Sequence, residues 1–443
     1  MPSKTKQVKT RKTTLPEKSE FLPIRNLPAA PNLHLGMQYF IPEWDDRVDP
    51  RYEFLNDKLT PGRDLFKDEL YAHEIFETAN YDGILVSRVV IDKSKKKKEA
   101  LYQVGLRNFL RYNGKIMGDC GAFGYIKEEV PPYTTEEILE YYHQLGFNYG
   151  VSVDHLIVGV FAEIGVREKR YDITLKNALD FIQKHQERGY KFTPIGVAQG
   201  WSPESYANAV KELISMGYNY VALGGVARER SKNILEILEA VHPHLTANTH
   251  IHLLGVGRIN AVPAFRHLGV TSFDSASPLR SAWLDSAANY HTLSGTTYTA
   301  VRIPQVEKSG VRIKRLLEAN VSDIKTLHRL EQDSLHALRE FQAGRLSLEK
   351  TLHILLTYDE LLELPRDGKV DPGKQAKRQE KHAEMYKKLL LDKPWQQCDC
   401  RICQDIGVEV IIFRGNDRNR RRGFHNTYVF YKRFKEILLK EGE

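Results

Sequence analysis

Three of the four cysteines in this chain stand close together in the sequence, at Cys398, Cys400 and Cys403. Disulfide-forming cysteines of a secreted protein are spread along the chain, whereas a tight cluster is typical of metal ligation. His425 is the only histidine that follows them, and it provides a fourth ligand. Three thiolates and one imidazole form a closed tetrahedral zinc site, and thiolate ligands disfavour magnesium and calcium. We therefore predict a structural rather than a catalytic Zn²⁺ ion at these four residues.

Three aspartates, Asp119, Asp154 and Asp274, each stand at or near the end of an apolar run of the kind that forms a β-strand. Any one of them alone would suit a helix cap or a turn equally well. Three carboxylates at strand ends with glycines around them favour chemistry, and base exchange at a glycosidic carbon is a reaction that would use all three. One can attack an oxocarbenium-like centre, a second can move protons to the departing base, and a third can accept the N1 and amino donors of a guanine. The residues alone leave open which aspartate takes which part.

Glycines gather at the same predicted strand ends, where they allow the backbone to approach a flat base closely. Glycine is also ordinary at strand-to-helix junctions, so these positions support the chemistry only together with the aspartates. Phe123 could stack on a purine, and plain core packing is the alternative for this ring. The glycines are Gly121, Gly200, Gly224, Gly225, Gly255 and Gly257.

Short apolar runs alternate with amphipathic stretches from about residue 80 to 280, which predicts parallel βαβ units. Seven strands are visible and an eighth is expected before residue 80, so we predict an α/β fold with a (β/α)8 TIM-like barrel. A doubly wound open sheet is the alternative. A barrel places the carboxyl ends of its strands at one mouth, where active sites are built. The strand runs cover 81–91, 115–125, 149–157, 192–200, 220–227, 251–257 and 272–277. Helices are expected at 135–145, 174–188, 203–216 and 231–241, with Thr134 or Thr135 and Ser202 as N-caps.

By composition, the whole chain divides into four expected parts. Residues 1–30 form a basic disordered tail, 31–300 the barrel, 301–392 a helical insertion, and 393–443 a zinc-binding subdomain with a C-terminal helix. Within the insertion, leucines at helical spacing predict helices over 323–345 and 372–391. In the last part we expect a strand over 408–413 and a helix over 427–439.

Positive charge is concentrated in three clusters, within a net charge of +8 and a pI near 9.0. Basic clusters bind phosphates by releasing condensed counterions, so nucleic acid is the expected partner, although solvated lysine faces are the alternative for any one cluster. No apolar run reaches the roughly 18 residues of a membrane span, and the N-terminus lacks a secretory signal, so we expect a cytoplasmic protein without a membrane partner. The clusters are a tail from Lys4 to Lys12, a loop with Lys93 and Lys95 to Lys98, and Arg418 with Arg420 to Arg422. The last cluster and Arg414 lie inside the zinc loop, and we expect these five arginines to reach a phosphate backbone.

Six motifs in order resemble the tRNA-guanine transglycosylase family. The resemblance covers roughly 80–285 and 396–430. Residues 119–124 are similar to the family motif Asp-Ser-Gly-Gly-Phe-Gln, 198–200 to Val-Gln-Gly, 223–227 to Ile-Gly-Gly-Leu-Ala, 254–257 to Met-Gly-Val-Gly and 273–280 to Phe-Asp-Cys-Val-Leu-Pro-Thr-Arg, and Asp154 matches the base-reading Asp. The Cys-x-Cys-x2-Cys…His site follows them in the family's order. The first motif departs from the family at Cys120 and Ala122, and a long helical segment separates Asp274 from the cysteines.

The resemblance implies a role for each residue of the predicted site. Asp274 is the covalent nucleophile and Asp119 the general acid/base in this scheme. The substrate-binding residues are Phe123, which stacks on the base, and Asp154, Gln199, Gly224, Gly225 and Arg280.

Residues 37–50 and 81–88 resemble the branch of this superfamily that modifies DNA by inserting 7-cyano-7-deazaguanine (preQ0). The expected function is therefore replacement of guanine in DNA by preQ0, with accessory modification proteins and a homodimer as possible partners. The same exchange on tRNA is one alternative, since contact with a 2′-hydroxyl distinguishes RNA from DNA. A non-catalytic nucleic-acid-binding scaffold of the same fold is the other. A zinc hydrolase is disfavoured because the predicted metal site has no open position.

Overall fold

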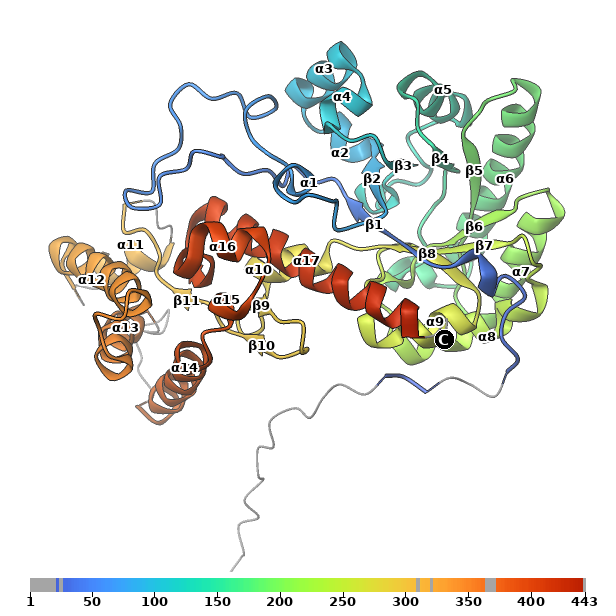
Figure 1. Cartoon of the computed structure of the whole chain (residues 1–443). Coiled ribbons are helices and arrows are strands. Elements are labelled where there is room, and N and C mark those ends of the chain that lie inside the picture. The colour runs from blue at the N-terminus through green and yellow to red at the C-terminus, as the bar shows by residue number, and fades with distance from the viewer. Residues whose placement is uncertain (1–20, 24–26, 308–310, 319–321, 363–371, 441–443) are drawn as a thin grey trace, which may run out of the picture.

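The computed structural model describes residues 21–23, 27–307, 311–318, 322–362 and 372–440. Eight parallel strands pair in chain order and close into a barrel, which confirms the predicted fold class (Figure 1). β1, from Gln38 to Pro42, is the strand expected before residue 80, and it closes the barrel by pairing with both β2 and β8. The other strands are β2 (Gly83–Ser87), β3 (Lys115–Asp119), β4 (Tyr149–Val151), β5 (Thr193–Ala198), β6 (Tyr220–Leu223), β7 (His250–Leu253) and β8 (Val270–Asp274).

Strand register brings the polar strand ends to one mouth of the barrel. Phe40 of β1 lies opposite Asp274 of β8, and Ser87 of β2 lies opposite Asp119 of β3. Below the mouth the interior is filled mainly by apolar side chains, as a closed eight-stranded barrel requires. This inner cluster consists of Phe40, Leu85, Met117, Val151, Ile195, Val197, Tyr220 and Ala222.

Helices cover the outside of the barrel, and two of them, α5 and α7, begin at a capping side chain that the sequence predicts. The Thr134 side chain accepts a hydrogen bond from the Glu137 amide, and the Ser202 side chain accepts one from the Ser205 amide, so Thr134 and Ser202 are the N-caps. The helices that follow β3 to β8 are α5 (Thr135–Leu145), α6 (Val166–Glu187), α7 (Pro203–Ser215), α8 (Ser231–Val241), α9 (Val262–His267) and α10 (Ser277–Leu284). Those that follow β1 and β2 are α1 (Ala72–Ile75), α2 (Arg88–Asp92), α3 (Lys95–Val104) and α4 (Leu106–Leu110).

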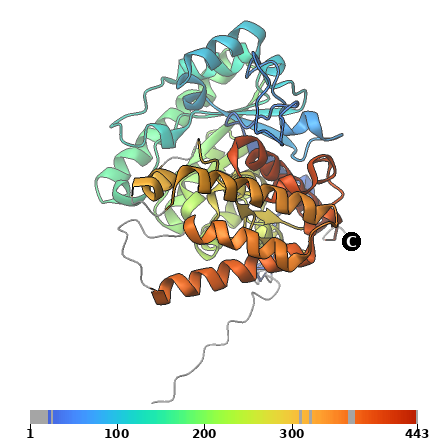
Figure 2. The same ribbon diagram turned by 90° about the vertical axis from the view of Figure 1, so that its left-hand side faces the viewer.

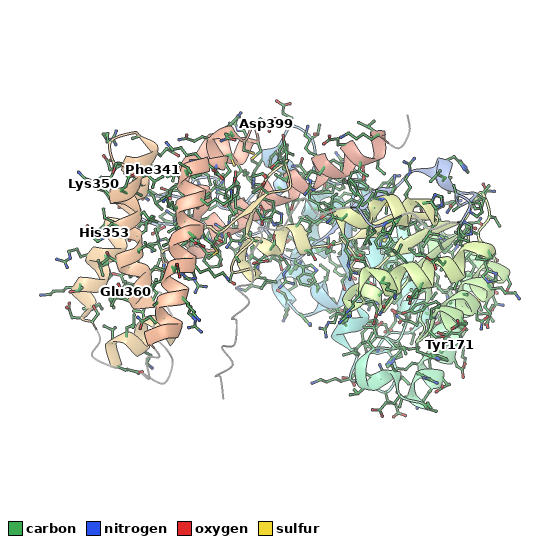
Figure 3. All side chains as sticks on the ribbon, turned by 90° about the horizontal axis from the view of Figure 1, so that it is seen from below. Tyr171, Phe341, Lys350, His353, Glu360 and Asp399 are labelled. Carbon is green, nitrogen blue, oxygen red and sulfur yellow. The ribbon has the colours of Figure 1, made fainter. Side chains whose placement is uncertain are left out.

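A helical layer lies beside the barrel and is joined to it by short strands. α12 packs on α13, and α13 packs on α14, side by side in Figure 2. In Figure 3 the labelled α13 side chains of Lys350, His353 and Glu360 lie at the end of the molecule away from the barrel. The helices are α11 (Val311–Glu318), α12 (Ile324–Gln342), α13 (Leu348–Leu362) and α14 (Pro372–Asp392). The strands are β9 (Tyr290–His291) with β10 (Thr297–Tyr298), and β11 (Val301–Arg302) with β12 (Ile412–Phe413).

The C-terminal part contains two short helices, α15 (Pro394–Gln397) and α16 (Arg401–Ile406), and one long helix, α17 (Gly415–Lys440). α17 extends from the helical layer to the barrel, where the rings of Phe430 and Phe434 pack on Phe273 of β8 (Figure 1). The prediction of a helix over only 427–439 was wrong at its start, and most of the strand predicted over 408–413 is a 3-10 helix, with β12 as its only extended part.

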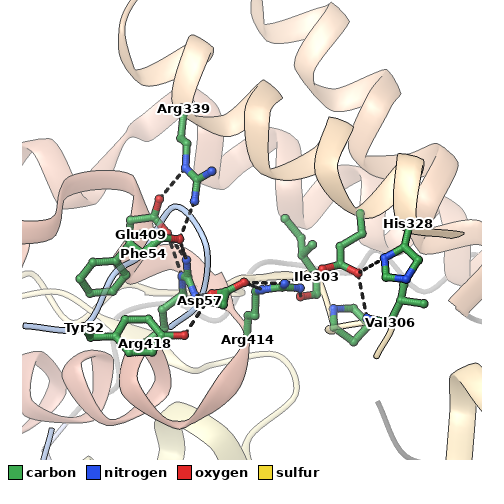
Figure 4. Close-up of polar contacts among 12 residues, drawn as sticks. Tyr52, Phe54, Asp57, Ile303, Val306, His328, Arg339, Glu409, Arg414 and Arg418 are labelled. Atoms are coloured by element: carbon green, nitrogen blue, oxygen red, sulfur yellow. Dashed lines mark hydrogen bonds and ion pairs between the residues drawn. The ribbon is translucent and has the colours of Figure 1, made fainter. Parts of the chain in front are cut away.

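The arginine-rich start of α17 is buried, so the prediction that these arginines reach a phosphate backbone was wrong for four of the five. Asp57 accepts hydrogen bonds from both Arg414 and Arg418. Arg414 also pairs with Glu331 of α12, and Arg418 with Glu409 (Figure 4). Every member of this cluster is at most 9% exposed. Arg421 and Arg422 are buried as well, and they donate to the backbone carbonyls of Asp49, Val410, Ile412 and Ala282.

The predicted lysine loop is a helix, α3, and one of its lysines faces the core. Lys97 is 1% exposed, and its Nζ lies 2.5 Å from a Glu43 oxygen and 3.0 Å from an Asp45 oxygen. Lys95 and Lys98 are exposed, as a phosphate-binding role requires. Residues 1–20 of the expected basic tail lie outside the described residues. In the described part of residues 21–30, the Leu22 and Ala30 amides donate hydrogen bonds to backbone carbonyls of the barrel domain. No helix in the described ranges has the length and apolar content to cross a membrane.

Candidate active site and metal centre

A cavity of about 1060 Å³ opens at the carboxyl end of the barrel. All three predicted aspartates, Asp119, Asp154 and Asp274, line it. Four other predicted substrate-binding residues line the same cavity: Phe123, Gly224, Gly225 and Arg280. Its size is that of an ordinary small-molecule site, large enough for a purine and its sugar. The barrel thus brings these seven residues together from the ends of four strands, β3, β4, β6 and β8.

Asp119 ends β3 and is held by its own loop. Burial raises the pKa of its carboxyl to about 6, hydrogen bonds from the Gly121 amide and the Ser87 hydroxyl lower it, and the nearby charge of Asp274 raises it. Gly121 has a φ of +84°, and a side chain there would collide with Ser87, so glycine is required for this loop to turn back onto the carboxylate. A carboxyl with a pKa of about 6 can both give and take a proton near neutral pH.

Asp154 follows β4 and is almost fully buried, at 2% exposure. Gln199, which the sequence placed at the same mouth, lies behind the cavity wall and donates from Nε2 to Asp154 Oδ2 at 2.7 Å. Burial and the charge of Asp119 raise the pKa of Asp154 to about 7, although the hydrogen bond from Gln199 lowers it. A side chain at Gly224 would collide with the Gln199 amide. Gly224 therefore leaves room for the Gln199–Asp154 contact.

Asp274 ends β8 and is 6% exposed. Its Oδ1 accepts two hydrogen bonds, one from the Gly255 amide at 2.8 Å and one from His252 Nε2 at 3.2 Å. Gly255 belongs to the glycine pair that follows β7. One oxygen of the carboxylate is therefore fixed by two donors of the neighbouring strand end, while the residue still faces the cavity.

Aromatic rings and arginines frame the opening of the cavity. Phe123 is 50% exposed, so the ring is not core packing, and the Arg228 guanidinium lies 6.0 Å from its centroid. Arg280 lies 4.3 Å from the ring centroid of Trp44, which is 44% exposed. Exposed rings beside guanidinium groups can stack on bases and contact phosphates.

Sequence reasoning missed several residues of this site. Trp44, Lys93 and Ser275 line the cavity, Ser87 hydrogen-bonds Asp119, and His252 contacts Asp274. A polar residue at an inward position of a barrel strand is a signal that could have identified Ser87 and His252. Trp44 carries no such signal, because the loop after β1 has no regular pattern.

The cysteine cluster folds into a compact group of potential metal ligands. Cys398, Cys400, Cys403 and His425 place one ligand atom each within 4.8 Å of one another. The three Sγ atoms lie 3.3–3.6 Å from His425 Nδ1. An ion at the centre of a tetrahedron with Zn–S and Zn–N bonds of about 2.3 and 2.0 Å would give edges of about 3.5 Å, so the donor set and the spacing fit a metal of this kind.

A second layer of contacts fixes His425 and ties the cluster to the barrel. His425 Nε2 bonds the His291 carbonyl at 2.8 Å, which leaves Nδ1 directed at the sulfurs, and the Tyr290 ring stacks on the imidazole at 4.2 Å. The next residue of α17, Asn426, donates to the Ser281 hydroxyl of α10 at 3.1 Å. Since α10 begins three residues after Asp274, the cluster braces the segment that follows the predicted nucleophile.

Comparisons with known proteins agree on one family. Residues 67–298 match the family model described as queuine tRNA-ribosyltransferase. A DNA-guanine transglycosylase from Salmonella montevideo is 40% identical over 428 residues, which cover 92% of this chain and 99% of that protein. The tRNA-guanine(15) transglycosylase of Methanocaldococcus jannaschii is 26% identical over 204 residues, 44% of this chain and 30% of that protein. The Nanoarchaeum equitans protein of the same name is 25% identical over 227 residues, 49% of this chain and 52% of that protein.

Proposed function

The chain belongs to the queuine tRNA-ribosyltransferase family, as a guanine transglycosylase of its DNA-modifying branch, and we propose that it replaces guanine in DNA with preQ0 through a covalent intermediate on Asp274. The observation that carries this proposal is the convergence of Asp119, Asp154 and Asp274 on one cavity at the barrel mouth. Their three environments differ, which suits three different roles.

In the first half of the proposed reaction, Asp274 attacks C1′ of the deoxyribose. A bond forms between its carboxylate oxygen and C1′ while the C1′–N9 bond breaks, and the departing guanine takes a proton from Asp119. Asp119 suits this role because its pKa of about 6 lets it carry a proton at a useful fraction near neutrality. The sugar is then held on the enzyme as an ester of Asp274.

In the second half, preQ0 takes the place of guanine. Its N9 attacks C1′, the proton from N9 passes to Asp119, and the ester bond breaks to return Asp274 as a carboxylate. Two displacements at C1′ give overall retention of configuration. Asp154, held by Gln199, faces the N1–H and amino donors that guanine and preQ0 share, and Phe123 stacks on the heterocycle.

DNA is favoured over tRNA as the substrate by the extent of similarity. The relative named a DNA-guanine transglycosylase matches 92% of this chain, whereas the two archaeal tRNA enzymes match less than half. The target guanine would leave the duplex and enter the cavity, which costs a few kcal/mol of stacking and pairing. Arg280 and exposed lysines such as Lys93 would contact the phosphates around the flipped nucleotide. The accessory proteins and the homodimer that the sequence analysis expects as partners remain predictions.

Zn²⁺ is the metal proposed for the cysteine cluster. The four ligands fill a tetrahedron, so the ion would have a structural role and supply folding energy rather than activate substrate. Its ligands lie in α16, in α17 and in the segment between α15 and α16, and it would hold these elements against α10.

Incubation with duplex DNA and preQ0, followed by digestion to nucleosides and mass spectrometry, tests the proposed exchange. We expect 7-cyano-7-deaza-2′-deoxyguanosine with the unaltered enzyme and none with Asp274→Asn, which keeps the size of the side chain but lacks the charged nucleophile. Equimolar tRNA in the same tube is the matched control. If the tRNA is modified while the DNA stays unmodified, the substrate is tRNA instead. Absence of both products would contradict the exchange itself.

A further inference from the structure

A chain of three buried polar side chains ends at Asp274 from inside the barrel. The Tyr220 hydroxyl lies 2.6 Å from Ser272 Oγ, Ser272 Oγ lies 2.7 Å from His252 Nδ1, and His252 Nε2 lies 3.2 Å from Asp274 Oδ1. Tyr220 is 5% exposed, and Ser272 and His252 are fully buried. They come from β6, β8 and β7, three neighbouring strands.

The direction of the hydrogen bonds follows from the chemistry of each group. An ionised Asp274 only accepts, so His252 Nε2 must carry a proton. The neutral imidazole then accepts at Nδ1 from the Ser272 hydroxyl, and Ser272 Oγ accepts from Tyr220. Every group of the chain is satisfied without a second buried charge.

This polar chain passes through the mainly apolar interior of the barrel. The inner cluster around Tyr220 is otherwise apolar, and the Phe40 ring meets the His252 ring edge-on at 6.1 Å. Polar groups in such surroundings destabilise the fold unless they are fully paired. An apolar layer would fill the same space without that requirement. The polar side chains are therefore explained by the Asp274 carboxylate, which the last of them contacts.

We propose that His252 is a positioning residue for the transglycosylase reaction, and that Ser272 and Tyr220 fix its tautomer. His252 and the Gly255 amide hold Oδ1 of Asp274, which leaves Oδ2 as the atom that attacks C1′. In the ester intermediate Oδ1 becomes the carbonyl oxygen, and both donors stabilise the negative charge that returns when the C1′–Oδ2 bond breaks. This inference rests on the proposed role of Asp274 as nucleophile.

Removing the donor without changing the packing tests the proposal. His252→Phe should lower kcat for exchange roughly 10- to 100-fold, the range for loss of a hydrogen bond to a charged group, while KM and Kd for DNA stay within about twofold. His252→Gln, which retains an N–H donor, should recover part of the lost rate. The matched control is His250→Phe on the same strand, because His250 packs on Tyr220 and bonds Thr271 but does not contact Asp274. We expect this control to keep the wild-type kcat.

A double-mutant cycle separates positioning from general destabilisation. Ser272→Ala should lower kcat by itself and cause no further loss in the His252→Phe background, because it acts only through the tautomer. Wild-type kcat in His252→Phe, or additive losses in the double variant, would overturn the proposal. An inactive wild-type enzyme would count against the proposed function. Crystals of His252→Phe would then decide the inference: a rotated Asp274 carboxylate supports it, and an unmoved one overturns it.

Discussion

The three aspartates of the cavity have the same side chain but different surroundings, and the surroundings determine what each can do. Asp119 turns back onto its own glycine loop, Asp154 is buried beside an amide, and Asp274 has one oxygen held by two donors. Burial raises the pKa of Asp119 to about 6, and burial with the added charge of Asp119 raises that of Asp154 to about 7. The sequence predicted that the three would meet, but the environment that distinguishes them depends on burial, which is set by the assembled barrel.

The raised pKa of Asp154 predicts a pH dependence. Only the ionised carboxylate accepts both guanine donors, and a pKa raised to about 7 leaves much of it protonated at mildly acidic pH. Because Asp119 gains its catalytic proton over the same pH range, binding of the free base isolates Asp154, and we expect the affinity for preQ0 to fall as the pH decreases from about 7 to about 6. Since the Gln199 hydrogen bond lowers the pKa of Asp154, Gln199→Leu should move this acid limb to higher pH. Measured pH profiles that are flat over this range, or a limb that moves to lower pH in the variant, would contradict the assignment.

Regular elements were predicted best where an apolar run or a capping residue marks them. α5 and α8 match their predicted ranges, because Thr134 caps the first and a clear apolar face marks the second. α6 begins at Val166 rather than at residue 174, since its first turns carry charged residues such as Arg170, which turns out to be buried and bonded to backbone carbonyls. The start of α17 was missed for the same reason: its arginines are typical of a solvated loop, and only their distant acidic partners allow a buried helix.

The cysteine cluster should contribute stability through α17. Cys400→Ser removes one of the four potential ligands, and we expect it to lower the free energy of unfolding by several kcal/mol, because a structural metal contributes directly to folding. Thermal unfolding with and without a chelator measures this. Cys120→Ser is the matched control, since Cys120 is equally buried but lies outside the cluster. An unchanged Tm for Cys400→Ser, with no response to the chelator, would refute the metal assignment.

At the scale of the whole molecule, the buried ion cluster joins three distant parts of the chain. Asp57 comes from the loop after β1, Glu331 from the helical layer, and Arg414 and Arg418 from the start of α17. The hydrogen bonds and charges of the two arginines outweigh burial and leave the pKa of Asp57 below its ordinary value. Asp57 is separated from Arg414 and Arg418 by 357 and 361 residues, and Glu331 is separated from Arg414 by 83. Such pairs leave no periodic signal in the sequence, so the docking of the helical layer could not be predicted, whereas its helices could.

Breaking this cluster should destabilise the protein more than breaking a surface pair. Asp57→Asn leaves two buried guanidinium groups without their shared carboxylate, and we expect a loss of about 3–5 kcal/mol in the free energy of unfolding. Asp405→Asn is the control, because its pair with Arg401 is exposed and should contribute less than about 1 kcal/mol. Urea denaturation curves give both values. Equal losses in the two variants would contradict a structural role for the buried cluster.

The most direct test of the account is to identify the covalent intermediate. The enzyme is incubated with guanine-containing duplex DNA in the absence of preQ0, denatured in acid, digested with nuclease and protease, and examined by peptide mass spectrometry. We predict a deoxyribosyl adduct on the peptide that contains Asp274, absent in Asp274→Asn and discharged when preQ0 is added before denaturation. An adduct on Asp119 or Asp154, or exchange without any adduct, would contradict the central claim.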